Sequence, residues 1–284
     1  MLYIFSALYC EAQAIIKYFH LEKETQSVHF QEFYNESLGI RLTVTGVGEI
    51  AAAVSVGSIC AAHRPGREDM LLNIGTCAHR TKRGEIYLCN KIIEQATGKT
   101  FYPDVLYRHD FCEEAVVTGM LAWNDKKDNP MMADAGCDAN IYDMEAAAIY
   151  QAGSYFFGPH QMAFLKVASD SGGAEGVCEK QVRQLMEEHQ NMIFSFIEQL
   201  LVISHGKESK KLCRNEEAVI ERLCADMHCS QVMRDSLKNH IHYMELAKME
   251  YMPVIQRMYE EGLIPCKDKR EGKVRFEELK RRLF

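Results

Sequence analysis

The chain has 284 residues, 47% hydrophobic and 26% charged, which suits a globular protein with one large domain or a medium-sized domain and a smaller appendage. Its formal net charge of −7 disfavours a broad nucleic-acid-binding surface, because phosphate contacts require clustered lysine and arginine. The longest apolar runs are interrupted by charges and are too short to cross a bilayer, so we expect no membrane partner.

The amino terminus and the cysteines indicate a reducing, cytoplasmic setting. Residues 1–12 are apolar but lack a basic segment and a small-residue cleavage site, so they predict a buried first strand rather than a secretion signal. The 11 cysteines are scattered, odd in number and form no CxxC pair, which favours reduced thiols. Cys224, His228 and Cys229 match no ordinary zinc spacing, and we expect neither a metal nor another cofactor.

Strand-like and helical patterns alternate through the first 205 residues. The strand-like runs cover residues 2–8, 28–34, 40–47, 70–75, 84–96, 114–119, 139–144 and 161–169. The helical patterns cover residues 10–19, 49–63 and 177–203. Strands that alternate with helices and form continuous apolar runs predict an α/β domain of three layers, with a mixed, largely parallel central sheet.

The character of the chain changes after the polar stretch at residues 204–211. Beyond it the patterns are helical only, at residues 215–227, 230–262 and 275–284, with Pro253 expected to interrupt the second. We therefore predict one domain at residues 1–205 and a small all-helical C-terminal extension at 206–284. The basic residues near the C-terminus are expected to form a solvated helix face.

Small and acidic residues follow several of the apolar runs, at the place where ligands bind in parallel sheets. These residues are Glu11, Gly46 with Gly48, Gly75 with Thr76, Met144 with Glu145, and Ser169 with Asp170. Each acid alone is better explained as a cap that interacts favourably with a helix dipole. Three carboxylates from separate strands, with glycine turns between them, predict a shared site instead.

The glycine turn also raises a dinucleotide-binding hypothesis. Gly46, Gly48 and Ala51 satisfy the pattern G-x-G-x-x-A after a strand. That hypothesis requires an acid at the end of the next strand, whereas Glu68 and Asp69 precede that strand. We interpret the glycines as a turn that lets a ligand's polar groups approach the start of a helix.

Taken together, the motifs resemble a known superfamily. In order and rough spacing they are similar to the purine nucleoside phosphorylase and uridine phosphorylase superfamily, and most of all to the methylthioadenosine/S-adenosylhomocysteine nucleosidases. The similar segments are VTGVGEIAAAVSVGS, LLNIGTCA, RGEIYL, YDMEAAAIYQ and KVASDSGG. The resemblance extends over residues 1–205. It implies a nucleoside phosphorylase-like fold, activity on a purine nucleoside and a homodimer.

The resemblance also implies roles for individual residues. Glu11 corresponds to the glutamate that activates the attacking water, and Asp170 to the general acid at purine N7. Met144 would lie under the ribose, and Glu145 would accept hydrogen bonds from its hydroxyls. Thr76 stands where a serine adjoins the sugar or phosphate pocket. The candidate catalytic residues are thus Asp170 and Glu11, and the candidate substrate-binding residues are Glu145, Met144, Thr76, Gly75, Gly46 and Ser169.

The residue types suit cleavage of an N-glycosidic bond, with either water or phosphate as the co-substrate. Proton transfer to the leaving base from a carboxylic acid is typically worth about 10²–10⁴ in rate, and a second carboxylate can deprotonate water, as in glycoside hydrolysis. Phosphorolysis needs arginines that hold a dianion. This chain has Lys166 where an arginine often precedes the aspartate, and Arg80 and Arg83 lie in a segment expected to be solvated. Hydrolysis is therefore favoured over phosphorolysis.

The segment beside the base departs from the family. The stretch that normally forms the purine pocket is shorter here, and the base-side element is reduced to TGMLAW at residues 118–123. Trp123 is a candidate for stacking on a base, with a place in the core or an interface as the alternative. These departures leave two hypotheses open: an unusual nucleoside as substrate, such as a 5′-modified one, or a nucleoside-binding regulatory module without turnover whose helical extension contacts a partner.

Overall fold

The computed structural model describes residues 1–25, 27, 29–122, 139–171, 178–205, 219–230, 233, 234, 236, 237, 240, 241, 244 and 249–283. The chain divides into two compact units, Met1–His205 and Gly206–Phe284. Within the ranges just given, no helix has the length and apolar character needed to cross a membrane. Trp123 lies outside the described residues.

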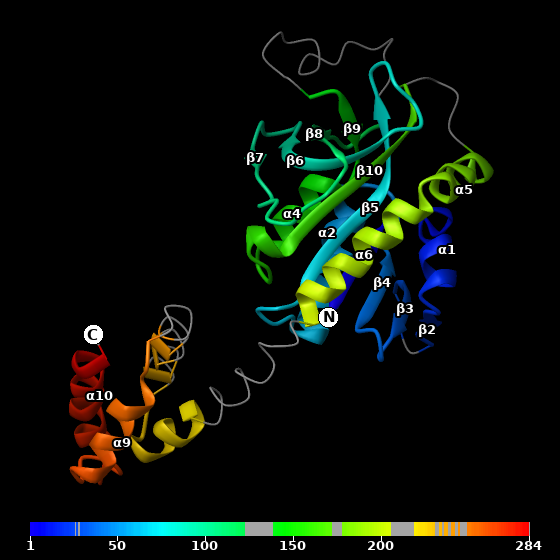
Figure 1. The fold of residues 1–284 in the computed structure, drawn as a ribbon. Helices are drawn as coiled ribbons and strands as arrows, with labels where there is room; N and C mark the ends of the chain where they lie inside the picture. The colour runs from blue at the N-terminus through cyan, green and yellow to red at the C-terminus, as the bar shows by residue number, and fades with distance from the viewer. Residues whose placement is uncertain are drawn as a thin grey trace. The chain divides into compact units, whose positions relative to one another are not determined.

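The first unit is built on a ten-stranded mixed sheet (Figure 1). Its strands are β1 (Leu2–Ser6), β2 (Glu22–Lys23), β3 (Gln31–Asn35), β4 (Ile40–Val44), β5 (Met70–His79), β6 (Ile86–Glu94), β7 (Thr100–Phe101), β8 (Cys112–Thr118), β9 (Ile141–Asp143) and β10 (Met162–Asp170). The strand order is β10-β6-β8-β9-β5-β1-β4-β3-β2, with β7 paired to β6. Because β10 also pairs with β5, the strands β5, β10, β6, β8 and β9 close into a barrel, and the remaining strands extend from β5 as an open sheet.

The central strands share one polarity, which defines the edge where the candidate site lies. β1 runs parallel to β4 and β5, and β10 runs parallel to β5. The register aligns Asn73 with both Phe5 and Phe164, so the carboxyl ends of these strands lie at the same side of the sheet. β9 runs antiparallel to β5, with Tyr142 opposite Ala78, so its C-terminal end points back along β5 toward that region.

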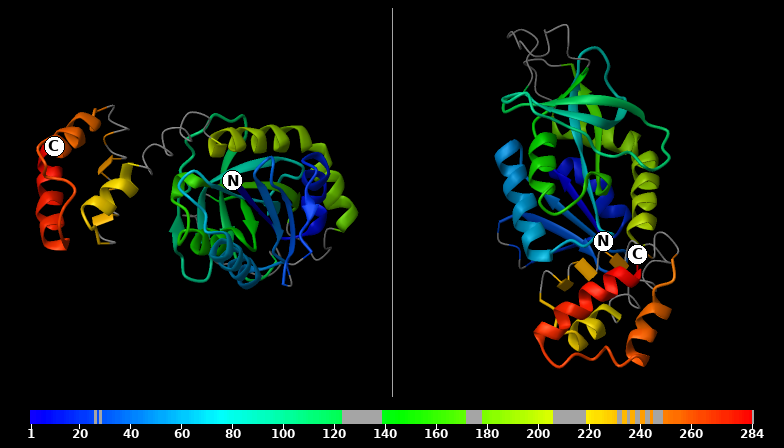
Figure 2. Two further views of the ribbon diagram at one scale, coloured as in Figure 1. Left: turned by 90° about the horizontal axis from the view of Figure 1, so that it is seen from below. Right: turned by 90° about the vertical axis from the view of Figure 1, so that its left-hand side faces the viewer.

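Helices cover both faces of the sheet. They are α1 (Tyr9–Tyr18), α2 (Glu49–His63), α4 (Ala146–Gly153), α5 (Glu179–Glu188) and α6 (Gln190–His205). Alternate side chains of a strand point to opposite faces. Leu2 and Ile4 therefore join the core under α1, α5 and α6, whereas Tyr3 and Phe5 join the core under α2 and α4. Figure 2 shows these two helical layers on either side of the strands.

Two strands continue beyond the ends expected from the sequence. β5, expected at residues 70–75, reaches His79 because it gains further partners in β9 and β10. Gly75 and Thr76 therefore lie within the strand instead of after it. β10 extends through Asp170, and its register shifts between Ala168 and Asp170, so the ladder is irregular at the Ser169–Asp170 pair.

The single helix expected over residues 177–203 is two helices, α5 and α6, separated at His189. The Nε2 atom of His189 lies 2.8 Å from the carbonyl oxygen of Gly84. The break allows α5 to pack against α1 and β10 while α6 packs against β1. Helical periodicity alone does not reveal such a break, because the apolar stripe continues on both sides of it.

The second unit has a hydrophobic core of its own. It contains α9 (Met252–Glu260) and α10 (Lys269–Leu283), whose inward residues include Met258, Phe276 and Leu279. Across the part of the chain that the structure describes, no group of three or more histidine, cysteine, aspartate or glutamate side chains is arranged to hold a metal ion.

Candidate functional site

The carboxylate of Glu11 is buried and accepts four hydrogen bonds. Glu11 lies in the first turn of α1 and is only 2% exposed. Its Oε2 accepts from Ser6 Oγ at 3.0 Å and from the Leu8 N–H at 2.9 Å. Its Oε1 accepts from the Thr76 N–H at 2.7 Å and from Thr76 Oγ1 at 2.8 Å. These contacts tie the end of β1 to the middle of β5 and bring two predicted site residues, Glu11 and Thr76, together.

Gly75 is the reason that Glu11 can lie against β5. A Cβ atom at this position would be 3.1 Å from Glu11 Oε1 and 3.2 Å from Oε2, which is tighter than nine in ten real Cβ contacts. The glycine thus permits a close approach of the carboxylate to the strand. We call Ser6, Leu8, Glu11, Gly75 and Thr76 the Glu11 corner.

Glu145 lies at the N-cap of α4 and meets the glycine turn that precedes α2. It is 6% exposed, and its Oε1 accepts a hydrogen bond from the Gly48 N–H at 2.8 Å. Gly48 has φ of +99°, a conformation that residues with side chains rarely adopt. Gly46 has φ of +83°, and its N–H donates to the carbonyl oxygen of Ala7 at 3.1 Å. The backbone donor that reaches the carboxylate therefore belongs to Gly48, while the Gly46 N–H is used within the fold.

Asp143 and Lys166 form a buried ion pair next to Glu145. Lys166 Nζ lies 2.7 Å from Asp143 Oδ2, with the side chains 1% and 0% exposed. Asp143 Oδ2 also accepts from the Ala146 N–H at 2.9 Å, and Oδ1 accepts from Thr118 Oγ1 at 2.6 Å. Thr118 Oγ1 in turn accepts from the Ala147 N–H at 3.0 Å. We call Thr118, Asp143, Glu145 and Lys166 the charged corner.

The charged corner contains a carboxyl group that titrates near neutral pH. The pKa of Glu145 is raised to about 7, first by burial and then by the neighbouring Asp143 carboxylate. Lys166 and the Gly48 N–H lower the pKa of Glu145, and the Glu11 carboxylate raises it. Burial lowers the pKa of Lys166, but Asp143 and Glu145 outweigh it, so its pKa is raised overall. Lys166 therefore stays charged while Glu145 changes its protonation, and Glu11 and Glu145 are close enough to interact electrostatically.

Asp170 and Ser169 end β10 at the same edge of the sheet. Asp170 is half-buried and pairs with Ala78 of β5, two positions beyond Thr76. Ser169 Oγ lies 2.8 Å from Asp170 Oδ2 and 3.2 Å from the Cys77 carbonyl oxygen, and it can donate to one of them. Strand register thus places Asp170 about 7 Å along β5 from Thr76, using a rise of roughly 3.3 Å per residue.

Met144 is half-buried and lies between the buried residues Asp143 and Glu145. Among the predicted site residues, Glu11, Gly75 and Thr76 are thus in direct contact. Glu145 interacts electrostatically with Glu11. Met144 is placed near the site only by its position in the chain beside Glu145.

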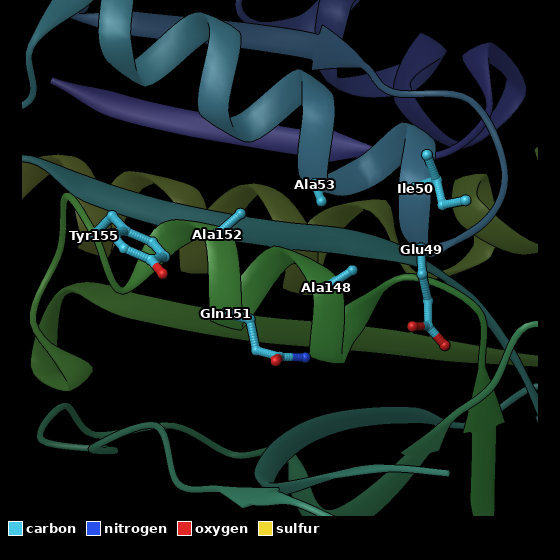
Figure 3. Close-up of a pocket in the computed structure, with 7 residues that line it drawn as sticks. All are labelled: Glu49, Ile50, Ala53, Ala148, Gln151, Ala152 and Tyr155. Atoms are coloured by element: carbon cyan, nitrogen blue, oxygen red, sulfur yellow. The ribbon is translucent and has the colours of Figure 1, made fainter. Parts of the chain in front are cut away.

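A separate pocket of about 400 Å³ lies between α2 and α4. It is lined by Glu49, Ile50, Ala53, Ala148, Gln151, Ala152 and Tyr155. In Figure 3, Ala53 of α2 faces Ala148 and Ala152 of α4 across this groove. None of the predicted site residues lines it, although Glu49 adjoins Gly48. Carboxyl groups can donate and accept protons, so the buried, hydrogen-bonded carboxylates, and not the groove, define the candidate site.

Three residues of the two corners were not among the predicted site residues: Ser6, Thr118 and Asp143. Lys166 was predicted only as a replacement for an arginine. The sequence does contain a signal for Lys166 and Asp143. A lysine within the apolar run AFLKVA and an aspartate within IYDM each indicate a buried charge that requires a partner. The pairing itself could not be found from the sequence, because it joins β9 to β10 across the fold.

Comparisons with known proteins identify the fold. No family model and no curated protein matches the sequence. Among solved structures, the 5′-methylthioadenosine/S-adenosylhomocysteine nucleosidase of Neisseria meningitidis, in complex with methylthio-immucillin-A, has 15% identity and a TM-score of 0.58, covering 72% of this chain and 98% of that one. The 5′-methylthioadenosine nucleosidase of Arabidopsis thaliana has 17% identity and a TM-score of 0.57, covering 70% and 95%.

The chain has the fold of these nucleosidases. The futalosine hydrolase of Helicobacter pylori shares it too, with 14% identity and a TM-score of 0.54 over 68% of this chain and 97% of that one. The resemblance drawn from the sequence motifs is thereby confirmed for the fold. At identities this low, a shared fold does not by itself assign a substrate or a residue's role.

Proposed function

We propose that the protein is a nucleosidase that hydrolyses the N-glycosidic bond of a purine nucleoside, with 5′-modified adenosines such as 5′-methylthioadenosine as the first candidates. The observation that carries the proposal is the placement of two buried carboxylates, Glu11 and Glu145, within electrostatic reach of each other at the carboxyl edge of the central strands. The shared fold supports it, since the similar structures are nucleosidases and a futalosine hydrolase.

In the proposed reaction, the bond between C1′ of the ribose and the base nitrogen breaks, and its electron pair leaves with the base. Asp170 gives a proton to the base, which neutralises the charge that develops there. Water attacks C1′ and passes a proton to Glu11, so the products are free base and free sugar. Glu145 accepts hydrogen bonds from the ribose hydroxyls and favours the positive charge on the sugar ring in the transition state.

The four donors around Glu11 constrain its role as the base. An ionised carboxylate has about four acceptor positions, and all four are engaged by Ser6, Leu8 and Thr76. The two backbone N–H donors are fixed by the fold, whereas the hydroxyls of Ser6 and Thr76 can rotate. We therefore propose that the attacking water takes the place of one hydroxyl donor when the substrate binds.

Water is preferred to phosphate as the co-substrate because the nearby cations are poorly placed for a dianion. Lys166 is buried and paired with Asp143. Arg80 and Arg83 are exposed, and Arg83 donates a hydrogen bond to Ser171 Oγ at 3.3 Å. The homodimer and the helical extension at residues 206–284 as a separate domain stay predictions from the sequence.

The test is base release from a panel of nucleosides, with and without phosphate. Purified protein is incubated with 5′-methylthioadenosine, S-adenosylhomocysteine, adenosine and futalosine, and the products are separated by liquid chromatography. We expect free base without phosphate, a loss of about 10²–10⁴ in rate for Asp170→Asn, and little change for the matched exposed variant Asp110→Asn.

Three outcomes would contradict parts of the proposal. Ribose 1-phosphate that forms only with added phosphate would indicate phosphorolysis. Tight binding without base release would favour a regulatory module, and unchanged turnover in Asp170→Asn would remove the role assigned to Asp170.

A further inference from the structure

The carboxylates of Asp143 and Glu145 accept different backbone hydrogen bonds near the start of α4. The first N–H groups of a helix need acceptors, and the N-cap side chain usually supplies one. Here Glu145 occupies the N-cap position without a capping hydrogen bond from its own side chain. Asp143 accepts from the Ala146 N–H and Thr118 from the Ala147 N–H instead. The carboxylate of Glu145 is thus released from capping and is directed to the Gly48 N–H.

The same network sets the charge next to Glu145. The charged groups that face Glu145 are Asp143 on β9, Lys166 on β10 and Glu11 on α1. Glu49, at the start of α2, adjoins Gly48, and its carboxyl interacts with Glu94 and Asp143. Among these groups Lys166 is the only cation. Its ammonium is held by Asp143 at 2.7 Å, so one buried salt bridge presents both an anion and a cation to Glu145.

We propose that Asp143, Thr118 and Lys166 are positioning residues for Glu145: they hold the start of α4 and place charges of both signs beside Glu145, so that its carboxyl group is directed at the ribose hydroxyls of the substrate. This inference rests on the proposed nucleosidase function. It assigns the buried ion pair a role in sugar recognition, beyond the stability that such a pair provides.

The opposite charges of the two partners make a sharp test possible. Asp143→Asn removes the anion and leaves the cation, so the pKa of Glu145 should fall. Lys166→Met removes the cation and leaves the anion, so the pKa of Glu145 should rise. Each shift should be about one unit or more, given that neighbouring charges move carboxyl pKa values by about 1–3 units. The double variant should lie close to the wild type, and Lys166→Arg, which keeps the charge, should too.

Two measurements report the protonation of the Glu145 carboxyl group. The first is the pH dependence of KM for 5′-methylthioadenosine, because loss of the ionised acceptor raises KM on the acidic side. The second is the titration of the side-chain carboxyl carbon of Glu145 by NMR in ¹³C-labelled protein, assigned with Glu145→Gln. The second does not require turnover. If the wild type releases no base, the proposed function fails, yet the NMR titrations still decide whether the pair controls Glu145.

The expected result is opposite displacement of the two single variants in the NMR titration and, where turnover is present, in the pH profile of KM. Displacement of the Glu145 pKa in the same direction in both variants, or no displacement in folded Asp143→Asn protein, would overturn the proposal. A pair with a purely structural role would lower stability in both variants without moving the Glu145 pKa in opposite directions. If Lys166→Met does not fold, Asp143→Asn, Lys166→Arg and the double variant still distinguish the outcomes.

Discussion

The Glu11 corner and the charged corner hold their carboxylates in different ways. Glu11 is surrounded by uncharged donors, two of which come from residues 6 and 8 in the same turn of the chain. Glu145 is surrounded by charges from β9 and β10 and by one backbone donor, Gly48, that is 97 positions away in the sequence. Hydrogen bonds from uncharged donors fix the position of the Glu11 carboxylate, whereas the ion pair beside Glu145 places charges of both signs next to that carboxyl group. Under the proposed function, the first corner would accept a proton from water, and the second would bind the sugar with an affinity that depends on pH.

The largest effect is expected for Glu11→Gln. The amide cannot take a proton from water, so kcat for base release should fall by about 10²–10⁴, with a smaller change in KM. Steady-state kinetics with 5′-methylthioadenosine measures both constants. Glu22→Gln, which makes the same change at an exposed position of β2, is the matched control and should behave as the wild type. A rise in KM without a loss of kcat would assign Glu11 to binding instead.

Lys166→Met is expected to produce the next largest effect, on stability. Removal of one partner from a buried pair leaves an uncompensated charge and typically costs about 3–5 kcal/mol in the free energy of unfolding. Urea denaturation followed by circular dichroism measures this loss. The control is Lys82→Met, which breaks an exposed pair with Glu85 at 3.2 Å and should cost less than about 1 kcal/mol. Equal costs for the two variants would show that burial of the Asp143–Lys166 pair has no energetic consequence.

The smallest effect is expected for Thr118→Val, which is nearly isosteric. The substitution removes the hydroxyl that accepts from the buried Ala147 N–H and donates to Asp143 Oδ1. The loss of these two hydrogen bonds should lower the free energy of unfolding by about 1–3 kcal/mol. Thr100→Val on the exposed strand β7 is the control, because valine suits a strand as well as threonine does. The same urea titration measures both. No difference between them would mean that the start of α4 is held by Asp143 alone.

Much of the fold could be predicted because its signals are local. Apolar runs located β1, β4 and β6, and small residues at helical spacing located α2. The ends of β5 and β10 and the break at His189 could not be predicted, because they depend on partners elsewhere in the chain.

The residues of the candidate site could likewise be predicted from local signals, whereas their contacts could not. Its acids could be selected because polar residues after apolar runs meet at one sheet edge. Their geometry could not, since the contact of Glu11 with Thr76 and that of Glu145 with Gly48 each join distant segments.

By itself, the sequence determined the positions of most strands and helices, and it identified the acids that follow the strands, because hydrophobic periodicity and turn residues act over a few positions. Only the tertiary structure decided that Asp143, and not Glu145, accepts a hydrogen bond from the first turn of α4, and that Lys166 pairs with Asp143 within electrostatic reach of Glu145. The physical reason is that burial and electrostatic interaction depend on distance in space, and the closure of the barrel brings β9 and β10 together.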